Sequence, residues 1–139
     1  MSQAALLYPI LGLICWTFVM WIWMYATRIP AMQKAQIDVE ALSRTGAPLT
    51  LPPEVARVAD NYNHLHEQPT IFYALVLSAA MLGAVDTIQV ILAWAYVGIR
   101  VVHSLVQATG NIIIVRFGVF AAGSFVLLAL LLRTIYLLL

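Results

Sequence analysis

Polar side chains that could bind a ligand or react are concentrated at two places in an otherwise apolar chain. Of 139 residues, 63% are hydrophobic and 9% are charged, yet residues 61–69 read NYNHLHEQP. At the second place, residues 96–111, polar side chains recur every three or four positions, which is the spacing of one helical face. Carboxylates, imidazoles, amides and a guanidinium in such patterns can bind a polar ligand, transfer protons or hold helices together.

Each group of polar residues is predicted to form one stripe on a helix. At about 100° per residue, the first group fills a wedge of about 120° and leaves the rest of the helix apolar. The second group is narrower and faces away from a continuous apolar surface. The first stripe contains Arg57, Asp60, Asn61, His64, Glu67 and Gln68, and the second contains Tyr96, Arg100, His103, Ser104, Gln107 and Asn111.

The depths of the two stripes in the membrane predict that they face each other. The two helices are predicted to join near residues 84–86, at the outer face of the membrane. Counting 1.5 Å per residue from this turn, Glu67 lies about 26 Å deep and Arg100 about 21 Å deep. An arginine in mid-span costs about 2.5–3.5 kcal/mol even on a lenient insertion scale, so it must find a partner inside the protein. We therefore predict an ion pair between Glu67 and Arg100, with His64 and His103 beside it.

Pro69 is predicted to kink the helix that carries the first stripe. Pro53 and Glu54 make a favourable helix start, and the helix is expected to continue to Leu82. A proline at position 69 leaves the carbonyl of Leu65 without its usual donor, and a neighbouring helix or water must supply another.

Two simpler interpretations of these residues remain open. Polar groups inside a bundle can act only as hydrogen-bonding contacts between helices, and a buried ion pair can be purely structural.

A metal site is not expected. His64 and His66 are two positions apart and so point to opposite sides, and the paired Glu-x-x-His motifs of di-metal bundles are missing.

The hydrophobic pattern predicts a single all-α domain, residues 1–139, that crosses the membrane four times. Uncharged apolar stretches place the spans near residues 5–27, 66–84, 87–109 and 113–136. Basic residues concentrate between the first two spans, which places the loop 29–52 in the cytoplasm and both termini outside. A short amphipathic helix around residues 32–42 is a further expectation. A net charge of +1 without a basic patch gives no indication of nucleic-acid binding.

Three stretches of the sequence resemble the MAPEG family, the membrane-associated proteins in eicosanoid and glutathione metabolism. They are RVADNYNHLHEQPTIFYAL, YVGIRVVHSLVQATGN and RFGVF, which begin at Arg57, Tyr96 and Arg116. The resemblance is to the bacterial-type branch. It implies a four-helix bundle that forms a homotrimer and, for this chain, a place in a bacterial inner membrane among membrane lipids.

The resemblance also implies glutathione as a co-substrate. A transferase or peroxidase of this family would act on lipophilic substrates, with glutathione bound between neighbouring subunits. The cofactor-binding residues would then be Arg57, Asn61, His64, Glu67, Arg100, His103 and Gln107, and Arg116 would be the catalytic residue beside the thiol.

The alternative is a protein without catalytic activity, which would be a membrane scaffold, a lipid-binding protein or an accessory subunit of a larger membrane complex. The family's enzymes commonly carry arginine, asparagine and tyrosine where this chain has Asp60, His64 and Gln107. A carboxylate at position 60 would repel a glutathione carboxylate, which favours the alternative.

Overall fold

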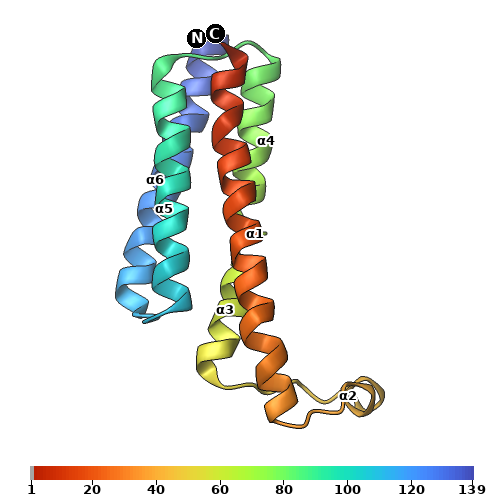
Figure 1. The fold of residues 1–139 in the computed structure, drawn as a ribbon. Helices are drawn as coiled ribbons and strands as arrows, with labels where there is room; N and C mark the ends of the chain where they lie inside the picture. Colours follow the sequence, from red (N-terminus) through yellow and green to blue (C-terminus); the bar gives the residue numbers. More distant parts are fainter. Residues whose placement is uncertain (1) are drawn as a thin grey trace.

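A computed structural model describes residues 2–139 as a bundle of helices, and it confirms the all-α prediction (Figure 1). The four long elements run side by side, and the two termini lie together at one end of the bundle. In chain order, the helices are α1 (Gln3–Lys34), α2 (Val39–Thr45), α3 (Pro53–His64), α4 (Gln68–Met81), α5 (Thr87–Ala108) and α6 (Ile113–Leu138).

Three helices, α1, α5 and α6, are long and apolar enough to cross a membrane. The fourth predicted span is divided between α3 and α4, which follow each other along α1 (Figure 1). The 14 residues of α4 span about 21 Å, which is less than the roughly 30 Å of a bilayer core. A crossing at this position would therefore need the polar helix α3 as well as α4.

The continuous helix predicted from Pro53 to Leu82 is interrupted rather than kinked. The helix ends at His64, and Glu67 takes φ −95° and ψ −99°, outside the helical region. Pro69 lies in the first turn of α4, where its missing N–H is not needed. The proline therefore starts a new helix instead of bending an existing one.

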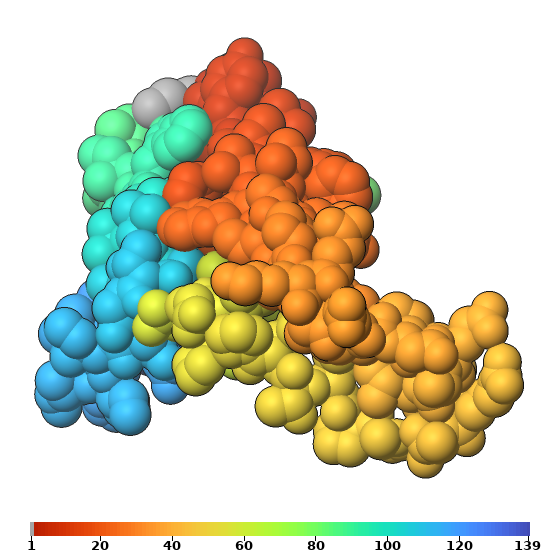
Figure 2. Space-filling model, turned by 60° about the horizontal axis from the view of Figure 1, so that its bottom comes forward, coloured from red at the N-terminus to blue at the C-terminus, as the bar shows by residue number. Residues whose placement is uncertain are grey.

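The loop between the first two crossings also differs from the prediction. Helix α1 continues to Lys34, and the short helix α2 begins later than the expected helix 32–42. Asp38 caps α2 by accepting hydrogen bonds from the N–H groups of Glu40 (3.0 Å) and Ala41 (3.1 Å). Gly46, with φ +67°, ends α2, and the helix lies apart from the bundle (Figures 1 and 2).

The helices α5 and α6 pack closely along their length. At Gly123 of α6, a Cβ atom would lie 3.2 Å from Cγ2 of Ile99, so a larger residue would push the two helices apart. Small residues allow this kind of close approach between membrane helices. Phe72 of α4 stacks on Tyr96 of α5 with ring centroids 4.6 Å apart, which joins α4 to the same core.

A polar clamp joins α5 to α6 at the end of the bundle where the termini lie. Asp86 caps α5 through the N–H of Gln89 (2.8 Å) and accepts a hydrogen bond from Nε of Arg133 (2.9 Å). Burial alone would raise the pKa of the Asp86 carboxyl, but these hydrogen bonds and the Arg133 charge outweigh it and hold the pKa below its usual value. The pair also explains why a basic residue is tolerated at this end.

Candidate functional site

The polar face of α5 points into the bundle, as the sequence predicts. Arg100 and His103 are each 1% exposed, and Ser104 is 0% exposed, although all three carry hydrogen-bonding groups. The opposite side of the helix is apolar and faces outward, where lipid can cover it. This division confirms the stripe from Tyr96 to Gln107, whereas Asn111 lies beyond the end of α5, in the turn before α6.

Helix α3 presents part of its stripe to α5. Asn61 is fully buried and His64 is half-buried, whereas Asp60 and Glu67 are exposed. Arg57 is also half-buried, one turn before Asn61. The structure therefore brings Asn61, His64 and Arg57 to the buried side of α3 and leaves the two carboxylates outside it.

Arg100 contacts His64 rather than Glu67. Its Nη2 donates to Nδ1 of His64 at 2.9 Å and reaches the carbonyl oxygen of His64 at 3.4 Å. Among residues 2–139, the ion pairs are Arg44–Glu40 and Arg133–Asp86, so the predicted Glu67–Arg100 pair is wrong within this chain. The interruption after His64 is the reason, because it takes Glu67 out of the register of α3.

The contact with Arg100 determines the protonation pattern of His64. A guanidinium only donates, so Nδ1 of His64 must accept, and the proton of the neutral ring is on Nε2. The His64 and His103 rings lie 4.9 Å apart, and Phe120 of α6 packs 5.6 Å from His64. The two histidines, which were predicted to lie beside Arg100, are therefore close to each other.

Several buried polar atoms around this contact have no hydrogen-bond partner in the part of the chain that the structure describes. The interior of a folded protein rarely leaves such atoms unpaired, because each costs about 1–3 kcal/mol. Here they gather on the facing sides of α3 and α5, which is more than a simple helix contact requires. They are Nε of Arg57, both amide atoms of Asn61, Nε and Nη1 of Arg100, Nδ1 of His103, Oγ of Ser104 and Oε1 of Gln107.

A cavity of about 210 Å³ places Arg116 next to the two histidines. Its walls include His64, His103 and Arg116, with the aromatic rings of Phe117 and Phe120. Nη1 of Arg116 donates to Oδ1 of Asn111 at 2.8 Å, which orients the guanidinium from the turn between α5 and α6. The cavity thus combines one cation with apolar walls.

Of the residues that α6 contributes to the site, Arg116 was predicted and Ser124 was not. Ser124 accepts a hydrogen bond from Nε2 of Gln68 (2.8 Å), and the Tyr96 hydroxyl donates to Oε1 of Gln68 (3.2 Å). This chain of contacts ties the first turn of α4 to both α5 and α6. A signal was present in the sequence, since Ser124 is the one hydroxyl residue in the apolar stretch 117–132.

No group of three or more His, Cys, Asp or Glu side chains within residues 2–139 is arranged to hold a metal ion. The cluster is instead rich in donors, with arginines, amides and a hydroxyl. Donor-rich, cationic surroundings suit a ligand with carboxylates.

Comparison with known proteins places the chain in a family. The model of the MAPEG family matches residues 6–136, which is nearly the whole chain. Neither the comparison with curated proteins nor the comparison with solved structures finds a match. The family match agrees with the helical bundle and with its three helices that are able to cross a membrane. The chain is therefore an integral membrane protein that belongs to the MAPEG family.

Proposed function

We propose that the chain is a glutathione-dependent transferase or peroxidase that acts on lipophilic substrates. The observation that carries this proposal is the cluster of unpaired buried polar atoms between α3 and α5, centred on Arg100. Glutathione has two carboxylates and one amine, and Nε and Nη1 of Arg100 are two unused donors, each able to donate a hydrogen bond to an acceptor oxygen of the ligand. Asn61, Ser104 and Gln107 can bind the peptide groups between them.

Arg116 is proposed to act on the glutathione sulfur. Its guanidinium lies in the cavity with His64 and His103, and a nearby cation lowers the pKa of a thiol. The thiolate then attacks an electrophilic carbon or a peroxide oxygen, and the leaving group departs with its electron pair. Phe117 and Phe120 supply an apolar wall for the second substrate, which can reach the site from the lipid.

A homotrimer is part of the same proposal. Asp60 and Glu67 are exposed in the single chain, at the edge of the polar cluster. In an assembly with subunits packed against this edge, Glu67 can bind the glutathione amine of a neighbouring site. Membership of the MAPEG family favours that arrangement.

A second candidate is a lipid-binding or accessory membrane protein without turnover. The specific observation in its favour is Asp60, a carboxylate next to the fully buried Asn61. It would repel a glutathione carboxylate at close range.

Two measurements on detergent-purified protein decide between the candidates. Glutathione is titrated in a calorimeter, and conjugation of an aryl halide is followed by absorbance. We expect saturable binding and turnover that is abolished in Arg100→Gln and retained in Arg44→Gln, an exposed arginine of α2. If the wild-type protein neither binds millimolar glutathione nor turns over, the second candidate is correct.

A further inference from the structure

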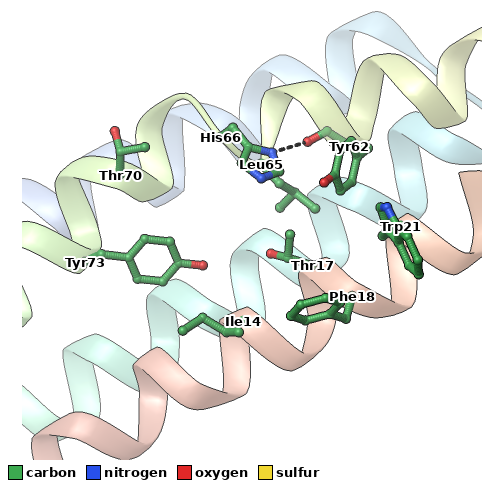
Figure 3. A pocket seen from close by; sticks show the side chains of 9 residues that line it. All are labelled: Ile14, Thr17, Phe18, Trp21, Tyr62, Leu65, His66, Thr70 and Tyr73. Carbon is green, nitrogen blue, oxygen red and sulfur yellow. Dashed lines mark hydrogen bonds between the residues drawn. The ribbon is translucent and has the colours of Figure 1, made fainter.

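A second cavity, of about 220 Å³, lies between α1 and the interruption of α3 and α4 (Figure 3). Residues from both sides converge on it, including Thr17, Phe18 and Trp21 from α1, with Tyr62, His66 and Tyr73 from the opposite wall. His64 and Arg116 line a different cavity, so this one is separate from the proposed glutathione site. His64 and His66 are two positions apart, so their side chains point to opposite sides of the interruption between α3 and α4.

The hydrogen-bonding groups of this cavity are partly committed and partly free. Nδ1 of His66 lies 2.9 Å from the carbonyl oxygen of Tyr62, so Nδ1 carries a proton and Nε2 of the neutral ring can accept. The Thr17 hydroxyl donates to the carbonyl of Leu13 (2.9 Å), which leaves its lone pairs to accept. Figure 3 shows the Tyr62 and Tyr73 side chains reaching toward α1, where their hydroxyls can donate.

Charge and depth restrict the class of ligand. None of the residues that line the cavity is Asp, Glu, Lys or Arg, and Thr17 lies near the middle of the 32-residue α1. A charged headgroup at mid-membrane depth would be costly without a counter-charge. The ligand must therefore be uncharged and soluble in the bilayer core, with a group that can both donate and accept hydrogen bonds.

Size and shape point to an aromatic ring. A closed apolar cavity of about 150 Å³ holds benzene, so this cavity of about 220 Å³ has room for a substituted single ring. It opens to the surface of the bundle, where Phe18 and Trp21 are 60% and 42% exposed. Phe18, Trp21, Tyr62 and Tyr73 supply aromatic faces and edges against which such a ring can pack.

We propose that this cavity binds a lipid-soluble hydroxyaryl compound, a phenol or hydroquinone, with its hydroxyl between Tyr73, Thr17 and His66. This site is independent of the proposed glutathione chemistry. The proposal concerns binding alone and includes no redox step.

Fluorine NMR of the full chain in lipid nanodiscs tests this site. The probe is para-trifluoromethylphenol, and its matched control is para-trifluoromethyltoluene, which replaces the hydroxyl by a methyl group of similar size. We expect a saturable bound resonance for the phenol. Tyr73→Phe should weaken binding of para-trifluoromethylphenol by about 5- to 10-fold, because one hydrogen bond is lost. Binding of para-trifluoromethyltoluene should be unchanged. Tyr8→Phe, at an exposed tyrosine of α1, should change the affinity for neither probe.

The remaining outcomes are also decisive. Equal affinity for the two probes, or no effect of Tyr73→Phe, would show that the cavity is an unselective apolar space and would overturn the proposal. A phenol signal identical to that of empty nanodiscs would overturn it as well. Arg100→Met should leave phenol binding intact, so a failure of the glutathione proposal is distinguishable from a failure of this one.

Discussion

Arg100 is the residue on which the functional interpretation depends. It is 1% exposed, contacts His64 through Nη2, and has no partner for Nε and Nη1 within residues 2–139. A purely structural arginine in a membrane bundle would be expected to use all of its donors, because each unpaired one is costly in a low-dielectric interior. The unused donors therefore indicate a ligand with acceptor groups.

Arg116 should affect chemistry more than binding. In Arg116→Gln, we expect kcat for conjugation to fall by about tenfold for each unit by which the thiol pKa rises, because less thiolate is present at neutral pH. The glutathione dissociation constant should change little. The pH profile of kcat checks this, since its inflection should move to higher pH in the variant and stay in place in Arg116→Lys. An unchanged profile in Arg116→Gln would exclude a role at the sulfur.

Asp60 is expected to weaken glutathione binding. The Asp60→Asn variant removes a like charge at the edge of the polar cluster, and glutathione should then bind a fewfold more tightly. The gain should be larger at low ionic strength, because salt screens exposed charges. Asp38→Asn is the control, since asparagine also caps α2 and the residue is exposed. The glutathione affinity of both variants is measured by calorimetry at two salt concentrations. The same change in affinity in Asp60→Asn and Asp38→Asn would contradict this prediction.

At the scale of the elements, the interruption between α3 and α4 has the largest consequences. It exposes the carbonyl of His64 to Arg100, turns Glu67 outward and opens the cavity that His66 lines. One local backbone change thus shapes both sides of the helix.

Pro69→Ala should partly close this interruption. An alanine N–H at position 69 can donate to the carbonyl of Leu65, which favours a continuous helix. We expect slower amide hydrogen exchange across residues 65–70 and weaker glutathione binding, because His64 and Arg100 would lose their present arrangement. Pro30→Ala, in the exposed part of α1, is the matched control. Unchanged exchange at 65–70 would mean that Pro69 does not maintain the break.

The hydrophobic pattern was sufficient to predict the three long helices α1, α5 and α6, and helical spacing predicted the inward polar face of α5. The alternation of polar and apolar residues directly reports which side of a regular helix is buried, so Arg100, His103, Ser104 and Gln107 could be placed. The partner of Arg100 could not be predicted in this way. That prediction assumed an unbroken helix, and the backbone change at Glu67 breaks the register on which the assumption depended.

Helix α6 shows a second limit of sequence reasoning. Its stretch 117–132 is apolar except for Ser124, and a single hydroxyl gives no periodicity that would identify its partner. The hydrogen bond from Gln68 to Ser124 depends on how three helices pack together, and packing of that kind is not encoded in the spacing of a single helix.

At the scale of the whole molecule, the polar groups form two separate layers. One contains the cluster around Arg100, and the other is the clamp of Asp86, Arg133, Gln89 and Thr134 near the termini, where the Gln89 amide lies 2.8 Å from Oγ1 of Thr134. The close approach of α6 to α5 at Gly123 lies beside the cluster, next to Ile99. The clamp therefore holds one end of the α5–α6 pair, and the cluster lies toward the other.

The clamp makes stability depend on pH in a defined direction. The pKa of Asp86 is lowered in the folded protein, so its contribution is complete above the unfolded pKa of about 3.9 and is lost as pH falls through the lower folded pKa. Thermal unfolding from pH 7 to pH 3 should therefore show a fall in Tm below about pH 4. In Asp86→Asn, we expect a lower Tm at pH 7 and a smaller fall; parallel curves would rule out this role.

Calorimetric titration of glutathione into wild-type protein and Arg100→Met tests the central claim most directly. Thermal unfolding is measured on the same samples. Methionine fills similar space without leaving a buried acid unpaired, since Glu67 is exposed, so Tm should be unchanged or higher. We predict saturable binding by the wild-type protein and loss of binding by a variant that is at least as stable. Equal binding by both proteins, or a large fall in Tm with no glutathione binding in either, would show that Arg100 is structural.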